Sequence, residues 1–318
     1  MQAMSRIFTS TRGSGGARLL AFVAATVVSA TLPLTACNQA PAQKSPAQKA
    51  PAQANWGPVD QALGRSGMTQ PDGVRRYAFP RSDLSVVLDG VTIKPALALG
   101  SWLAFDPAGK SAMVMGDLVL TQDEVNPVMA ELLKDGISVT AIHNHLLRAS
   151  PLTMYMHVEG QGDASKLALA LHSALARSKT PLGPPGAATQ AALDIDTAAL
   201  DRALAARGKA NGGVYQFTVP RAEKIVERGM TVGASMGTGT AINFQPLGGG
   251  RAAVTGDFVL LTKEVDPVMR ALKASGIDIT ALHSHMLDEQ PKLYFMHFWG
   301  VGDAKQLATG LRSALDRT

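Results

Sequence analysis

The chain has 318 residues, of which 46% are hydrophobic and 17% are charged, which excludes a largely disordered protein. Its formal charge is +5, but the surplus lies in three arginines and two lysines before residue 56, which leaves 25 basic against 25 acidic residues (30 − 3 − 2 = 25). This balance gives no reason to expect nucleic-acid binding.

Residues 1–36 have the features of a lipoprotein signal peptide. Arg6, Arg12 and Arg18 precede an apolar stretch that ends in Leu-Thr-Ala-Cys at residues 34–37. That ending resembles a bacterial lipobox, and the resemblance implies cleavage before Cys37 and its lipidation. Cys37 is the only cysteine, so no intramolecular disulfide can form. A plain signal peptide fits less well, because the sole cysteine falls at the end of the apolar stretch behind Leu-x-Ala. A transmembrane anchor fits less well, because the stretch is short and no basic flank follows it.

Residues 37–55 read as a tether, because Pro, Ala, Gln and Lys without large apolar side chains cannot build a core. A lipidated Cys37 followed by this tether predicts attachment to a membrane surface. Asn38 after the cysteine resembles outer-membrane sorting in Gram-negative lipoproteins. We therefore expect a lipid-anchored protein on the periplasmic side of a bacterial cell envelope.

The remainder is one unit present twice. Segments such as GDLVL at residues 116–120 and EVNPVM at 124–129 recur as GDFVL at 256–260 and EVDPVM at 264–269. We place the repeats at 56–178 and 194–318, with a linker at 179–193. Two long copies indicate a duplicated domain and not a solenoid.

Each repeat is predicted to be α+β with a largely antiparallel sheet, because runs of strand candidates are interrupted by helices. In the first repeat the strands are expected at 74–79, 85–88, 101–105 and 112–120, followed by a helix at 123–134. A β-hairpin follows, with strands at 137–146 and 152–160 and a turn at 149–151. Asp163 is expected to cap a last helix that reaches residue 176. The second repeat should open with a helix at 194–207.

The hairpin carries a histidine motif in both repeats. Six of the seven histidines belong to it: His143, His145 and His157, and 140 residues later His283, His285 and His297. A turn centred near Ser150 would place residue 143 opposite 157 and residue 145 opposite 155, so that three imidazoles share one face. Three histidines with an open fourth position are the arrangement of catalytic zinc, and imidazole also suits copper.

The two motifs have different neighbours. Tyr155 and Glu159 of the first repeat are replaced by Phe295 and Trp299 in the second. Glu159 is therefore the candidate acid, base or extra ligand, and Tyr155 a candidate hydrogen-bond donor.

Other candidates have structural explanations that are at least as good. Asp117 and Asp257 fit carboxylates that orient a ligand imidazole, or a turn or bulge. Asp163 and Asp303 fit helix caps better than ligands, and Glu124 and Glu264 fit the first turn of a helix. The methionines near the motif suggest copper handling but are more often core residues: Met154, Met156, Met286 and Met296.

Together, the lipobox and the duplicated motifs resemble the LppY/LpqO lipoproteins, also called domain of unknown function 1259. The resemblance covers nearly all of the chain after the tether. It implies an exported bacterial lipoprotein and supplies no reaction. The leading hypothesis is that the protein binds or sequesters zinc or copper. The alternatives are a zinc-dependent hydrolase with Glu159 as base, a structural envelope module with core histidines, and an imidazole site for a small anion.

Overall fold

The computed structural model describes residues 54–109, 111–184 and 192–318. The predicted signal peptide, Cys37 and almost all of the tether lie outside these residues. No helix in the described part of the chain is long and apolar enough to cross a membrane. Both repeats belong to one compact unit, Ala52–Thr318.

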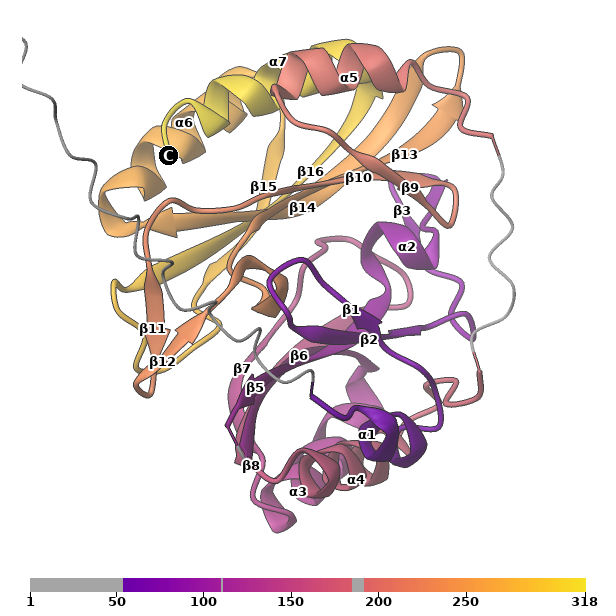
Figure 1. Ribbon diagram of the computed structural model, residues 1–318. Helices are drawn as coiled ribbons and strands as arrows, with labels where there is room; N and C mark the ends of the chain where they lie inside the picture. Colours follow the sequence, from indigo (N-terminus) through magenta and orange to yellow (C-terminus); the bar gives the residue numbers. More distant parts are fainter. Residues whose placement is uncertain (1–53, 110, 185–191) are drawn as a thin grey trace, which may run out of the picture. The chain divides into compact units, whose positions relative to one another are not determined.

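The first repeat has the predicted α+β composition (Figure 1). Its elements are α1 (Gly57–Ala62), β1 (Met68–Thr69), β2 (Arg75–Pro80), β3 (Val87–Leu88), β4 (Val91–Thr92), α2 (Pro95–Ala98), β5 (Gly100–Ala108), β6 (Ser111–Thr121), α3 (Gln122–Lys134), β7 (Ser138–His143), β8 (Thr153–Gly162) and α4 (Ala164–Leu175).

The second repeat follows the same order. Its elements are α5 (Thr197–Leu204), β9 (Lys209–Asn211), β10 (Val214–Val219), β11 (Ile225–Glu227), β12 (Met230–Val232), the 3-10 helix η1 (Ala234–Met236), β13 (Thr240–Gly248), β14 (Arg251–Leu261), the 3-10 helix η2 (Thr262–Glu264), α6 (Val265–Ala274), β15 (Asp278–His283), β16 (Leu293–Asp303) and α7 (Ala304–Leu315).

Each repeat forms one six-stranded antiparallel sheet. The strand orders are β1-β2-β5-β6-β8-β7 and β15-β16-β14-β13-β10-β9, so the histidine hairpin lies at one end of each sheet. Helices α1, α3 and α4 cover one face of the first sheet, and α5, α6 and α7 cover one face of the second (Figure 1). The predicted fold class is confirmed.

The two repeats pack through the sheet faces that carry no helices. Leu118 and Met156 point into the helix-side core, whereas Val119 and Tyr155 join a core shared with Trp299 of the second repeat. Both faces of β6 are therefore buried, which explains its almost uninterrupted apolar sequence.

Each repeat also extends a two-stranded hairpin over the other. Asp89, at the tip of β3–β4, accepts a hydrogen bond of 3.1 Å from the indole of Trp299. Arg228, at the tip of β11–β12, lies 3.2 Å from Glu159. Both tip residues have a positive φ, 48° and 46°. Each repeat thus contacts the other through its hairpin tip, with an acidic tip residue in the first repeat and a basic one in the second.

The helix starts confirm the structural interpretation of the acidic residues there. Asp163 accepts a hydrogen bond from the backbone of Lys166, and Asp303 caps α7 in the same way. Glu124 pairs with the fully buried Arg81 at 2.7 Å and also accepts from the Thr121 backbone. Glu264 forms the corresponding ion pair with Arg221 at 2.8 Å. These carboxylates stabilise the fold and are absent from the histidine site.

Gly256, next to Asp257, has no room for a side chain. A Cβ there would overlap the carbonyl group of Ala241 on β13 and lie 3.0 Å from Phe298. We expect Gly256→Ala to lower the free energy of unfolding by about 3 kcal/mol or more, because a backbone clash in a central strand cannot relax locally. Gly302→Ala is the matched control, since its nearest neighbour is 4.0 Å away. Equal urea midpoints for the two variants would contradict this packing.

Candidate metal centre

The histidine hairpin forms as predicted, but its register differs. His143 lies opposite Tyr155, and His157 lies opposite Ala141, so the pairing next to the turn is centred on residue 149 and not on Ser150. The expected pairing of residue 143 with 157 is therefore wrong by two residues. A register shift of two residues leaves each side chain on the same face of the sheet, whereas a shift of one residue would move it to the opposite face. The second hairpin has the same register.

A carboxylate from the adjacent strand faces each hairpin. Asp117 on β6 lies directly opposite His157 on β8, and Asp257 on β14 lies directly opposite His297 on β16. Asp117 Oδ2 is 3.7 Å from Nε2 of His145, and Asp117 Oδ1 is 3.9 Å from Nε2 of His157. These separations are too long for hydrogen bonds. They suit two ligands of one metal ion, which lie roughly 3.4 Å apart in tetrahedral geometry with bonds of about 2.0–2.1 Å.

The second repeat reproduces this arrangement. Asp257 Oδ2 is 3.5 Å from Nε2 of His285, and Asp257 Oδ1 is 3.8 Å from Nε2 of His297. The sequence predicts that these aspartates either orient a ligand imidazole or serve in a turn or bulge, but both lie among the candidate donors themselves. Asp117 and Asp257 were identifiable in the sequence, because each is the only charged residue inside an otherwise uncharged stretch of its strand.

The six histidines of the two repeats meet in one cluster. The rings of His143 and His283 lie with their centroids 3.5 Å apart and are tilted by 30°. His145 and His297 are 3.7 Å apart, and His157 and His285 are 3.6 Å apart. Each pair takes one ring from each repeat. The four donor groups whose ligand atoms lie within 4.8 Å of one another are Asp117/His145/His157, Asp257/His285/His297, His143/His145/His297 and His143/His157/His283/His285.

The donor atoms of this cluster are buried without hydrogen-bond partners among the described residues. This holds for Nε2 of all six histidines, for Nδ1 of His143 and His283, and for Oδ1 of both aspartates. Buried polar groups are normally paired, and leaving one unpaired costs about 1–3 kcal/mol. Many buried acceptor atoms thus lie close to one another without a partner from the protein. This is the arrangement expected around a bound cation.

Neighbouring groups hold the rings in place. Nδ1 of His297 lies 3.0 Å from the carbonyl oxygen of Gly256, and a proton on Nδ1 leaves Nε2 free as a ligand. Tyr155 stacks on His145, and Phe295 stacks on His285, each at 3.4 Å. The hydroxyl of Tyr155 donates to the carbonyl of Ala98, so this group is engaged in the fold.

Burial sets the protonation of the cluster. It lowers the pKa of His143 to about 3 and that of His283 to about 4, and holds the pKa values of the other four imidazoles well below their usual range. Burial also raises the pKa of Asp117 to about 8, against the opposing charge of Arg76. The imidazoles are therefore neutral at pH 7, which is the form that binds metal.

Glu159 lies apart from the donor groups. It is fully buried beside Glu227 and Arg228, and burial raises its pKa to about 7 while Arg228 acts in the opposite direction. It is two residues from His157 along β8, and it belongs to none of the four donor groups.

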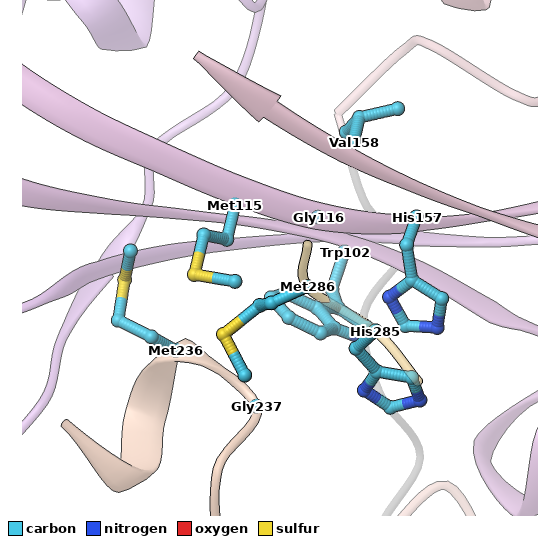
Figure 2. Close-up of a pocket in the computed structure, with 9 residues that line it drawn as sticks. All are labelled: Trp102, Met115, Gly116, His157, Val158, Met236, Gly237, His285 and Met286. Carbon is cyan, nitrogen blue, oxygen red and sulfur yellow. The ribbon is translucent and has the colours of Figure 1, made fainter. Parts of the chain in front are cut away.

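One side of the cluster borders a small cavity, which Figure 2 shows. It is lined by Met115, Met236 and Met286 together with His157 and His285, and its volume is about 10 Å³. That is room for about one water molecule. Met156, by contrast, packs into the helix-side core, as its position on the strand predicts.

A family model for the Domain of Unknown Function DUF1259 matches residues 57–177 and 198–317. The chain belongs to the DUF1259 family. The two matched segments coincide with the two structural repeats, and each contributes one aspartate and three histidines to the cluster. No curated protein matches the chain.

Solved structures give only distant similarities to this DUF1259 chain. The trimeric bacterial microcompartment shell protein PduB is 12% identical over 80% of this chain and 91% of its own, with a TM-score of 0.20. EtuB from Clostridium kluyveri is 9% identical over 79% and 88%, with a TM-score of 0.19. The double-ringed trimeric shell protein MSM0271 is 7% identical over 66% and 83%, with a TM-score of 0.18. These scores are too low to carry an argument about function.

Proposed function

We propose that this DUF1259 protein binds a transition-metal ion at a site formed jointly by its two repeats. The observation that carries the proposal is the set of buried imidazole and carboxylate atoms that have no partners and lie at the spacing of shared ligands. An envelope module with purely structural histidines would instead be expected to pair these atoms within the protein.

Zinc is the ion that the donors favour. The donors are imidazole and carboxylate groups, and the separations of 3.5 and 3.7 Å between aspartate and histidine atoms are closer to tetrahedral than to right-angled coordination. Copper is the alternative ion, because imidazole also suits it and methionines line the adjacent cavity. A small anion fits less well, since neutral imidazoles beside two carboxyl groups offer it no positive charge.

Ion binding is favoured over hydrolysis as the function. The cavity beside the histidines has a volume of about 10 Å³, which admits one water molecule but no larger substrate. Glu159, the proposed base of a hydrolase, is held beside Arg228. Storage or sequestration of the ion is therefore our leading proposal.

The location of this activity is a separate proposal. The lipobox ending at Cys37, the tether at residues 37–55 and the resemblance to LppY/LpqO lipoproteins support lipid attachment on the periplasmic side of a bacterial envelope. Labelling with a fatty-acid analogue should modify the chain and fail for Cys37→Ser. Equal labelling of the two would contradict lipidation at this residue.

Metal analysis of the purified chain after zinc loading and desalting tests the binding proposal. We expect zinc to be retained, and to be lost in the double variant His143→Ala/His283→Ala. His172→Gln is the control, because this seventh histidine lies on α4 away from the cluster. If the unmodified chain retains neither zinc nor, after a parallel loading with copper, copper, the proposal is refuted.

Glu159→Gln separates the ligand, base and structural roles of this residue. We expect the variant to retain its zinc in full, because Glu159 is outside the donor groups. Loss of the ion would make Glu159 a ligand. If a hydrolytic activity is detected, its loss in a variant with unchanged zinc content would instead support the base role.

A further inference from the structure

We propose that the site holds two metal ions face to face, one on the donors of each repeat. This inference rests on the proposed function and specifies its stoichiometry. Two observations support it: the donors of the two repeats form separate sets, and imidazoles of one set stack on imidazoles of the other.

The donors divide into two sets with no residue in common. Asp117, His145 and His157 form one set, and their ligand atoms lie within 4.8 Å of one another. The corresponding set from the second repeat, Asp257/His285/His297, meets the same limit. A carboxylate and two imidazoles are a common ligand core for one ion.

The stacking of the rings sets the distance between the two ions. His145 of the first set lies 3.7 Å from His297 of the second, and His157 lies 3.6 Å from His285. Each stack thus joins a ligand of one ion to a ligand of the other. Ions held at the Nε2 atoms of stacked rings would be separated by about the same distance. Two-metal sites have separations of about 3.5–4 Å.

His143 and His283 supply the remaining donors. Their rings are 3.5 Å apart, and both nitrogens of each are buried without partners in the described structure. His143 lies within reach of members of both sets. His283 lies within reach of His157 and His285. With these two residues the cluster has eight donor side chains, an average of four for each of two ions, which is the number that tetrahedral zinc uses.

A single ion accounts for the cluster less completely. One tetrahedral zinc ion would use four of the eight side chains, and the others would stay buried without partners. Each unpaired group would then cost about 1–3 kcal/mol. Two ions satisfy both halves of the cluster and preserve the symmetry between the repeats.

The first test is the zinc content of the full chain, loaded with zinc chloride and desalted. We expect two ions per chain, and one ion per chain in each of the single variants Asp117→Ala and Asp257→Ala. His172→Gln should keep two. Saturation of the unmodified chain at one ion would overturn the two-ion inference and leave the proposed function standing, whereas no retained ion would overturn both.

The second test needs no substitution and therefore does not depend on the folding of variants. The full chain is loaded with increasing copper(II) and followed by electron paramagnetic resonance. Two ions at about 4 Å should give a coupled spectrum with a half-field transition and a loss of signal as the second equivalent binds. Two equivalents that give only uncoupled signals would place the ions far apart and overturn the face-to-face arrangement.

Discussion

Zinc at a thousand times its dissociation constant should raise the free energy of unfolding by about 4 kcal/mol for each ion bound. The reason is that the donor set exists only in the folded chain, since its members come from residues 117 to 297 and meet across two repeats. For a folded unit of this size the melting temperature should rise by about 8–16 °C per ion. Thermal melts with zinc and with a chelator measure the difference.

The matched variants make this result specific. The double variant His157→Asn/His297→Asn removes one donor from each repeat and should abolish most of the zinc-dependent shift. His172→Gln changes a histidine on α4 and should leave the shift intact. A shift of equal size in the double variant would mean that zinc stabilises the chain at another place.

Acid should destabilise the metal-free protein between about pH 6 and pH 5. Burial lowers the pKa values of all six clustered histidines, to about 3 for His143 and about 4 for His283. Below the usual pKa of about 6.5 the unfolded chain therefore binds protons that the folded chain excludes. The stability contributed by these neutral imidazoles is present above pH 6.5 and is lost as the pH falls.

Buried carboxyl groups oppose this trend in part. Burial raises the pKa of Asp117 to about 8, that of Glu159 to about 7, and those of Asp257 and Glu227 in the same direction. These carboxyl groups bind protons in the folded chain at a higher pH than in the unfolded chain. Their contribution to the free energy of unfolding therefore grows as the pH falls. Once the unfolded histidines are fully protonated, well below their usual pKa of about 6.5, six histidines against at most four carboxyls leave a surplus of at least two protons (6 − 4 = 2), or about 2.7 kcal/mol per pH unit.

Urea unfolding at pH 7, 6 and 5 in the presence of a chelator measures this slope. The double variant His143→Gln/His283→Gln removes two of the six histidines and should reduce the slope by about 2.7 kcal/mol per pH unit. A stability that does not change between pH 6 and pH 5 in the unmodified chain would show that the histidines are not buried in the neutral form.

The duplication and the secondary structure could be predicted because they depend on local signals. Helix α3 begins where an apolar period of helical spacing meets Thr121 and Glu124, and its start is fixed by a hydrogen bond between these two residues. Asp163 similarly marks the start of α4. The hairpin register differs from the prediction because the conformation of the turn, which centres the pairing on residue 149, leaves no mark in the spacing of the histidines.

The sequence by itself determined that six histidines form two equivalent motifs, and that each motif lies on one face of a hairpin, because side chains two apart on a strand share a face. Only the tertiary structure decided that the two motifs stack on each other and that Asp117 and Asp257 join them. The physical reason is that the helix-free faces of the two sheets bury each other, which brings together donors 140 residues apart that no local pattern connects.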